Sequence, residues 1–176
     1  MSLATVAVAP GEAVLPFDLA SARKPVFSAL VDARKRYGRA TPALVDGDER
    51  ILTYDEIVRA AFALGHALKK GTKPGESVAI MLPSGAGAVI SFFAVSAFGR
   101  VPTMLNFTSG AQALKSALRT AEVKRVITAH RFIELGKLDE LIAELKDSAE
   151  MVYLEDVRAK LSLIDKAAAV VGQYAP

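Results

Sequence analysis

The sequence has 176 residues, of which 52% are hydrophobic and 23% charged, and its formal net charge is +3. This composition is ordinary for one globular domain and excludes a disordered chain, while the small net charge predicts no nucleic-acid partner. There is no cysteine, so the chain has neither a disulfide framework nor a thiolate nucleophile. The longest apolar helix-like run, residues 86–99, is too short to span a bilayer, and we expect a cytoplasmic protein.

Residues 1–24 lack the basic start and long apolar core of a signal peptide, and we expect them to form a flexible lead-in. Residues 25–37 predict an amphipathic helix that has a proline in its first turn and ends at Gly38. The helix finishes in a basic cluster formed by Arg34, Lys35, Arg36 and Arg39. Such a cluster is typical of a solvated helix end, and contact with an acidic partner or anionic lipid is the alternative.

Residues 43–46 and 50–53 predict two short strands joined as a hairpin through Asp46-Gly47-Asp48. Thr53 and Glu56 then have the spacing of a capping box, which starts a helix. His66 falls opposite the apolar face of that helix, so we expect it to be exposed. The apolar face recurs at helical spacing and consists of Ile57, Ala60, Ala61, Leu64 and Leu68.

No carboxylate occurs between Glu76 and Glu122, and the only charges there are Arg100, Lys115 and Arg119. A stretch with so little charge must be mostly buried. Short β-branched runs alternate in it with longer runs of small residues, as expected at the centre of a parallel α/β sheet.

The pattern predicts strands over residues 77–82, 101–105, 124–128 and 150–154. Helices are predicted between them, capped by Ser84 and by a Ser109/Gln112 capping box, and then over residues 137–145 and 156–174. Strands that alternate with helices predict a three-layer α-β-α fold with a mostly parallel, doubly wound sheet. Right-handed connections would place helices on both faces.

Two glycine-containing segments invite a nucleotide-binding interpretation, but neither has the full pattern. Residues 84–90 follow a strand and open a helix, yet Ile90 stands where a dinucleotide-binding loop needs a small residue, and no acidic residue follows for the ribose. Residues 108–115 do not fit a phosphate loop, which needs two glycines that flank four residues and are followed by Lys-Ser/Thr. Neither His66 nor His130 has a nearby partner for catalysis or metal binding. We therefore predict no catalytic residue and no metal ligand in this chain.

Three segments resemble the N-terminal subdomain of the acyl-adenylate-forming superfamily. They are residues 52–56 (LTYDE), 74–84 (PGESVAIMLPS) and 98–102 (FGRVP). They follow the family's order of a T-Y-x-E-L helix start, a G-D-x-V-A-I-x-L-P-N strand and an A-x-x-x-G-x-V passage. The departures, at Glu76-Ser77 and Ser84, fall on structural positions.

A narrower resemblance lies in four further segments, and the whole likeness covers about residues 25–166. Residues 102–110 (PTMLNFTSG), 121–124 (AEVK), 132–138 (FIELGKL) and 152–156 (VYLED) are similar to the synthetase part of the bacterial acyl-acyl-carrier-protein synthetase/lysophosphatidylethanolamine acyltransferase branch.

The resemblance implies a reaction for the complete enzyme. With ATP and Mg²⁺, a fatty acid carboxylate attacks the α-phosphate to give an acyl-adenylate and pyrophosphate. The thiol of acyl carrier protein, or of coenzyme A, then takes the acyl group. In the narrower branch, a separate acyltransferase domain passes the chain to a lysophospholipid, and the parent enzyme works at the cytoplasmic face of the inner membrane.

The family's phosphate loop, adenine strand, ribose-binding aspartate and catalytic lysine have no counterpart in the sequence. Phosphoryl chemistry depends on groups that position and stabilise charge. We therefore expect residues 25–176 to be the first α/β subdomain of the ligase, a fragment that is inactive alone, binds no cofactor and has the remaining subdomains as partners. A free-standing nucleotide-binding module and a protein-interaction domain are the alternatives.

Open parallel sheets bind ligands beyond the carboxyl ends of their strands. This rule selects Ser84 after one strand and Asn106, Phe107 and Thr108 after the next as the residues that would contact substrate or the missing subdomain. The alternative is that Ser84 and Thr108 only start helices. A separated subdomain should also expose an apolar face, and we expect self-association through it.

Overall fold

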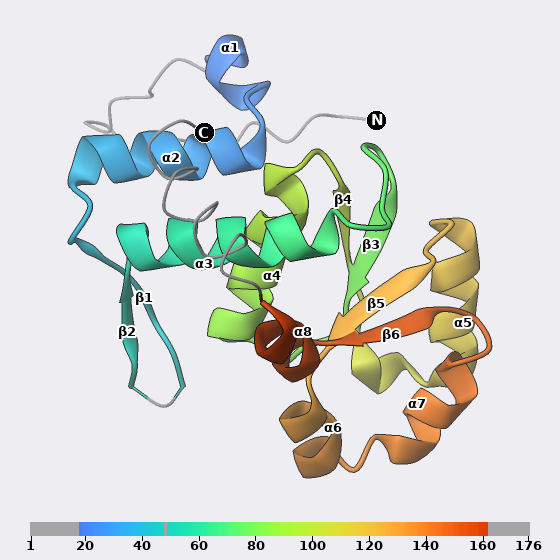
Figure 1. Ribbon diagram of the computed structural model, residues 1–176. Coiled ribbons are helices and arrows are strands. Elements are labelled where there is room, and N and C mark those ends of the chain that lie inside the picture. The colour runs from blue at the N-terminus through green and yellow to red at the C-terminus, as the bar shows by residue number, and fades with distance from the viewer. Residues whose placement is uncertain (1–17, 48, 162–176) are drawn as a thin grey trace, which may run out of the picture.

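A computed structural model describes residues 18–47 and 49–161 (Figure 1). Most of the predicted lead-in and most of the predicted C-terminal helix lie outside the described residues. The part of the lead-in that is described contains a short helix, α1 (Leu19–Ala22). The predicted C-terminal helix is represented by α8 (Leu154–Lys160), which begins two residues earlier than expected.

The centre of the fold is a four-stranded sheet in which every neighbouring pair of strands is parallel. Its strands are β3 (Ser77–Ile80), β4 (Val101–Met104), β5 (Arg125–Thr128) and β6 (Glu150–Tyr153). They lie in the order β4-β3-β5-β6. The predicted parallel α/β sheet is confirmed, with each strand one or two residues shorter than expected.

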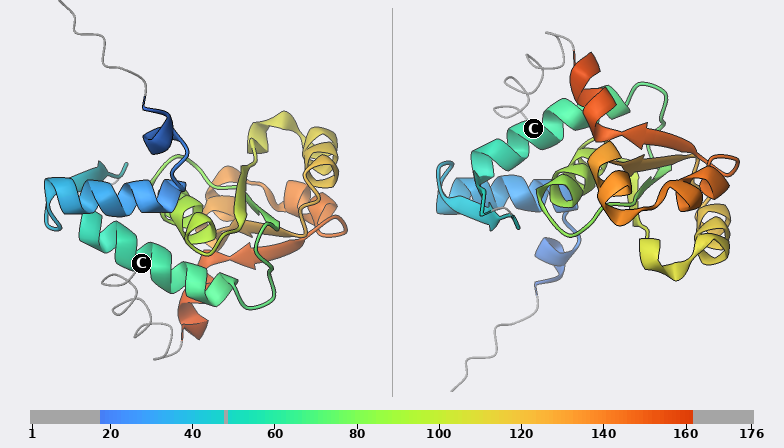
Figure 2. Two further views of the ribbon diagram at one scale, coloured as in Figure 1. Left: turned by 90° about the horizontal axis from the view of Figure 1, so that it is seen from above. Right: turned by 90° about the horizontal axis from the view of Figure 1, so that it is seen from below.

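Helices cover both faces of the sheet, which confirms the three-layer prediction. On one face lie α3 (Tyr54–Leu68) and α4 (Ala86–Ala97), with α2 (Val26–Tyr37) packed against both. On the other face lie α5 (Ala111–Thr120), α6 (His130–Gly136) and α7 (Asp139–Leu145). The two views in Figure 2 show this separation. The predicted hairpin is present as β1 (Pro42–Val45) and β2 (Ile51–Thr53), which pair antiparallel.

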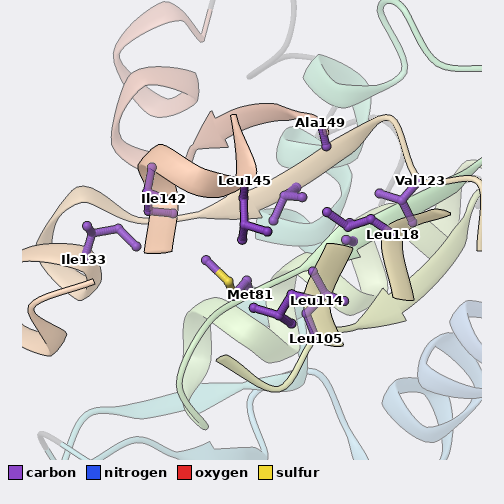
Figure 3. Close-up of a cluster of buried hydrophobic side chains, with 11 residues drawn as sticks. Met81, Leu105, Leu114, Leu118, Val123, Ile133, Ile142, Leu145 and Ala149 are labelled. Atoms are coloured by element: carbon purple, nitrogen blue, oxygen red, sulfur yellow. The ribbon is translucent and has the colours of Figure 1, made fainter. Parts of the chain in front are cut away.

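Successive residues of β3 and the segment after it serve opposite faces of the sheet, as alternation along a strand requires. Ala79 and Met81 belong to the hydrophobic cluster under α5, α6 and α7, which Figure 3 shows in close-up. Val78, Ile80 and Leu82 belong to the cluster under α4. Central strands of a parallel sheet are buried on both sides, so the near-continuous apolar run of this segment has a direct structural cause.

The Thr53 capping box is confirmed, but the predicted Ser109/Gln112 capping box is wrong. The Thr53 N–H donates to Glu56 Oε2 over 2.8 Å, and the Glu56 N–H donates to Thr53 Oγ1 over 3.3 Å. The Ser109/Gln112 box does not form, because α5 starts after Gly110 without a side-chain cap. The cap belongs instead to a 3₁₀ helix, η1 (Phe107–Ser109), whose Thr108 N–H donates to Asn106 Oδ1.

The region after β5 contains one helix more than predicted. No helix was predicted over residues 130–136, but they form α6, which ends where Lys137 adopts a left-handed conformation with φ of 50°. That turn delays the next helix, so α7 begins at Asp139 rather than at residue 137.

The basic cluster at the end of α2 is not wholly solvated. Arg34 is only 5% exposed, and its Nε donates to Asp55 Oδ1 over 2.7 Å. Arg39 binds both oxygens of the same carboxylate, each over 3.0 Å. Burial would raise the pKa of Asp55, but the hydrogen bonds and charges of the two arginines outweigh burial and lower it. The acidic partner of this cluster is therefore internal, at least for Arg34 and Arg39.

Helix α3 buries a slightly different face from the predicted one. Val58 and Gly65 are buried, whereas Ala60 and Leu68 are only partly so. His66, predicted to be exposed, is half-buried, with its ring 6.3 Å from that of Phe98. The difference arises because α3 packs closely on α4 along a line through Gly65.

Gly65 is a point of close approach between α3 and α4, and it provides a test of the packing. A Cβ there would lie 2.5 Å from the Ala94 carbonyl oxygen and 2.6 Å from the Phe98 ring. We expect Gly65→Ala to lower the free energy of unfolding by about 1–3 kcal/mol, because the helices must separate. Urea unfolding followed by circular dichroism measures the change.

Gly47→Ala is the matched control, because a Cβ at Gly47 meets nothing within 4 Å. It should change the free energy of unfolding by no more than about 0.5 kcal/mol. Equal stability of the Gly65→Ala protein and the wild type would contradict the close helix contact.

Candidate functional site

The strand order reverses between β3 and β5, and this reversal places a crevice at their carboxyl ends. From β3 the chain crosses through α4 to β4 on one side, whereas β5 lies on the other side of β3. Ligands of doubly wound sheets bind at such a switch point. A pocket of about 560 Å³ lies there. It is lined by Asp46, Leu82–Ala88, Ala129, Arg131, Phe132, Leu135, Gly136, Leu154 and Glu155.

The first turn of α4 faces this pocket, and a carboxylate from the hairpin caps it. The Ala86 N–H donates to Asp46 Oδ1 over 3.2 Å, and the same oxygen accepts the Gly47 N–H over 2.9 Å. The N-cap position of α4 is Gly85, which makes no side-chain cap, so the prediction that Ser84 caps this helix is wrong. A Cβ at Gly85 would lie 2.7 Å from Asp46 Oδ1, so glycine makes room for the carboxylate.

A second carboxylate caps α6 on the other side of the pocket. Glu155 accepts the His130 N–H at Oε2 over 3.0 Å and the Arg131 N–H at Oε1 over 3.2 Å. Burial alone would raise the pKa of Glu155, but these backbone hydrogen bonds and the nearby His130 outweigh burial and lower it. Glu155 belongs to α8, so the bond ties the end of the described chain to the helix that follows β5.

His130 is held in place by its neighbours from the last strand and helix. Its ring stacks on Tyr153 with a centroid distance of 3.8 Å, and Nε2 lies 3.1 Å from Asp156 Oδ1. Partial burial, followed by the charges of Asp156 and Asp139, raises the pKa of Tyr153. These contacts fix the geometry of the segment around Glu155 and bring no hydroxyl or carboxylate pair into the pocket for acid–base work.

The predicted site residues divide into two groups. Ser84 lines the pocket, as expected from its place after β3. Asn106, Phe107 and Thr108 follow β4 and are not among the residues that line it. Phe107 packs its ring against that of Phe132 at 4.9 Å, and Phe132 does line the pocket. A role for these four residues in binding substrate stays a prediction.

Asp46 and Glu155 are the two carboxylates that line this site, and the sequence identified neither of them as a site residue. Asp46 was interpreted only as a turn former, and Glu155 only as part of a family-like segment. Each binds backbone groups that are 24 to 40 positions away in the chain, and local spacing carries no signal for a contact of that kind.

Residues 30–173 match the protein family described as AMP-binding enzyme. The chain belongs to that family. Among curated members, 3-hydroxypropionyl-coenzyme A synthetase of Sulfurisphaera tokodaii is 33% identical over 96 residues. The match covers 54% of this chain and 15% of the relative. The chain thus spans only a small part of the length of such a relative.

Solved structures show the same fold. The structure of VinN superposes with a TM-score of 0.68 at 22% identity, over 82% of this chain and 37% of that one. The N-terminal subdomain of Klebsiella oxytoca NpsA, in complex with anthranilyl-AMSN, superposes with a TM-score of 0.62 at 19% identity. That match covers 79% of this chain and 33% of the chain in that structure. At these identities the likeness shows the fold alone, and it confirms the predicted N-terminal subdomain architecture.

AMP-binding enzymes use ATP and typically Mg²⁺, but the described part of this chain does not fit either group. Two sets of backbone N–H groups at the crevice, which could have met a phosphate, already have carboxylate partners. Among residues 18–47 and 49–161, no three His, Cys, Asp or Glu side chains gather in a way that could hold a metal ion. The same residues include no helix long and apolar enough to cross a membrane.

The double hydrogen bond of Glu155 can be tested by replacing it with glutamine. The two backbone N–H groups bond to different oxygens of Glu155, and glutamine replaces one of these acceptors with an NH₂ donor. We expect Glu155→Gln to lower the free energy of unfolding at pH 7 by about 1 kcal/mol, as for loss of a helix cap. Urea unfolding at pH 7, 5 and 3.5 measures it.

The sign of the pH dependence follows from the lowered pKa of Glu155. Its stabilisation is complete above the ordinary glutamate value of 4.5 and is lost as the pH falls through the lower value of the folded state. The difference between wild type and Glu155→Gln should therefore shrink at acid pH. Glu134→Gln, at an exposed position of α6, is the control. A difference that does not depend on pH would contradict the proposed role of the Glu155 charge.

Proposed function

We propose that this chain is the first α/β subdomain of an ATP-dependent ligase that activates a carboxylic acid as its acyl-adenylate and transfers the acyl group to a thiol. The observation that carries the proposal is the match to the AMP-binding family over residues 30–173. The curated relative named a coenzyme A synthetase supports a thiol acceptor.

The finer proposal is that the acid is a fatty acid and the acceptor is acyl carrier protein, with coenzyme A as the alternative. It rests on the four segments between residues 102 and 156 that resemble the acyl-acyl-carrier-protein synthetase branch. In that branch the acyl group goes on to a lysophospholipid, which would place the complete enzyme at the cytoplasmic face of the inner membrane.

Within such a ligase, this subdomain would serve as a scaffold that leaves the triphosphate to other parts of the enzyme. Asp46 and Glu155 place two negative charges beside the switch point, where a free phosphate would have to bind. Only Arg131 contributes a positive charge among the described residues that line the pocket. Phosphoryl transfer needs several positioned cations or N–H donors around the phosphates, and the Ala86, His130 and Arg131 N–H groups at this crevice are already bonded to carboxylates.

We therefore expect the chain alone to catalyse no ATP–pyrophosphate exchange with decanoate, octanoate or acetate, and to bind ATP without saturation in a calorimetric titration up to 1 mM (on the order of the weakest substrate affinities of enzymes). The protein expressed from the complete native reading frame is the positive control, and it should catalyse exchange with a fatty acid. Exchange by the chain alone, or saturable ATP binding to it, would favour a free-standing nucleotide-binding module instead. No exchange by the complete protein would contradict the ligase.

The outer surface of the hairpin supports a contact with the rest of the ligase. Val45 and Ile51 face each other across β1 and β2 and are 66% and 56% exposed. Val101 and Met104 are also exposed on β4, at the edge of the sheet. Exposed apolar surface of this kind is usually covered by a partner.

We expect the separated chain to self-associate through the exposed apolar face of the hairpin, formed by Val45 and Ile51. Static light scattering should give a mass that rises with concentration, and the double variant Val45→Thr, Ile51→Thr should lower the association. The exposed positions make these changes tolerable for the fold. A monomeric mass at every concentration would contradict the expectation.

A further inference from the structure

We propose that the pocket between α4 and α6 holds the hydrocarbon chain of the free acid that the ligase activates, a step that rests on the proposed function. The proposal concerns the pocket at the switch point, with its volume of about 560 Å³. This size lies in the usual range for small-molecule sites, which are concave and mostly apolar.

The lining of the pocket is apolar on both of its walls. Leu82, Ala86 and Ala88 form part of the wall from β3 and α4, and Phe132 and Leu135 form part of the wall from α6. Gly87 stands in the first turn of α4 and leaves space, because a Cβ there would touch only Leu154 at 3.6 Å and Leu82 at 3.9 Å. The two walls therefore form an apolar surface that a hydrocarbon chain can contact and to which water cannot hydrogen-bond.

The mouth of the pocket carries the most exposed large hydrophobic side chain found among the described residues. Leu135 is 72% exposed although it lines an apolar pocket. An isolated exposed leucine needs no explanation, but one at the entrance of an apolar pocket gains burial when a hydrocarbon enters. We therefore expect the hydrocarbon to enter the pocket beside Leu135.

The charges around the pocket favour an uncharged occupant over a phosphate. The lining contains two carboxylates, Asp46 and Glu155, and one guanidinium, Arg131, so its formal charge is +1 − 2 = −1. The two carboxylates also occupy the Ala86, His130 and Arg131 N–H groups. A triphosphate would meet repulsion from both carboxylates at these N–H groups, whereas a methylene chain carries no charge to be repelled. The carboxylate head of the acid is left at the solvent side, where Arg131 is exposed.

The test is a titration of the ¹⁵N-labelled chain with hexanoate, octanoate and decanoate, followed by amide chemical shifts. Each methylene that enters the pocket should raise the affinity about fourfold, since burying a CH₂ contributes about 0.8 kcal/mol. The shifts should concentrate on residues 86–88, 129 and 132–136, and added ATP should not displace decanoate.

Two variants address the pocket, and one serves as the control. Gly87→Leu places a side chain in the empty space and should weaken decanoate binding at least tenfold. Leu135→Gln changes an exposed position, so it keeps the fold even if Gly87→Leu does not, and it should weaken binding several-fold. Leu19→Gln makes the same chemical change at another exposed leucine, in α1, and should leave binding unchanged.

Three results would overturn the proposal: no saturable decanoate binding, binding that neither pocket variant weakens, or displacement of decanoate by ATP. Its failure is separable from failure of the ligase assignment. If the complete protein exchanges pyrophosphate while the chain binds no decanoate, only this proposal is wrong. If the chain binds decanoate in the pocket while the complete protein shows no exchange, the ligase assignment is wrong and the hydrocarbon site stands.

Discussion

The rest of the structure depends on one constraint, which is that β3 is hydrogen-bonded to a strand on each side and covered by helices on both faces. Ala79, Ile80 and Met81 have no exposed surface. A charge at any of these positions would be buried without a partner, at a cost of several kcal/mol. The long interval without carboxylates is the consequence of this constraint in the sequence.

Two of the three charges in the interval, Arg100 and Lys115, find partners at the margins of the core. Arg100 follows α4, where its Nε donates to Thr72 Oγ1 and its Nη2 to the Thr72 carbonyl oxygen. Lys115 pairs with Glu144 of α7 over 3.2 Å. These contacts place the cations at helix ends and between surface helices, so the central strands remain free of charge.

The same constraint moves polar chemistry to the carboxyl edge of the sheet, where the strands stop and the helices begin. Backbone N–H groups at helix starts need partners. In many doubly wound proteins a ligand phosphate supplies them. In this chain Asp46 and Glu155 supply them, and the hairpin and α8 are thereby joined to the sheet edge. The crevice has the topology of a ligand site, but its two carboxylates make it unsuited to the negative charge of a nucleotide.

The sequence was sufficient for those features whose cause is local or periodic. The central strands β3 and β5 were predicted because burial on both faces leaves an apolar run, and the Thr53 capping box because its two hydrogen bonds span three residues. The family was recognised from short segments at these same elements. Helix α6 was missed, because seven residues with one buried position, Ile133, show no helical period.

The features that escaped prediction all depend on contacts between distant parts of the chain. Ser84 was expected to cap α4, but the carboxylate of Asp46 in the hairpin accepts the Ala86 N–H instead. Arg34 was expected in solvent, but α3 brings Asp55 against it. The candidate site was therefore only half predictable. Its position at the strand ends follows from topology, whereas its charge follows from tertiary contacts that no spacing encodes.

The central claim is that the carboxyl edge of this sheet is sealed against phosphate by the chain's own carboxylates and open to a hydrocarbon. Crystals of the chain grown with decanoate and ATP together would test it most directly. The account predicts density for an alkyl chain between α4 and α6, with Asp46 and Glu155 still bonded to the backbone N–H groups. Density for a triphosphate on the Ala86 N–H, with Asp46 displaced, would contradict it.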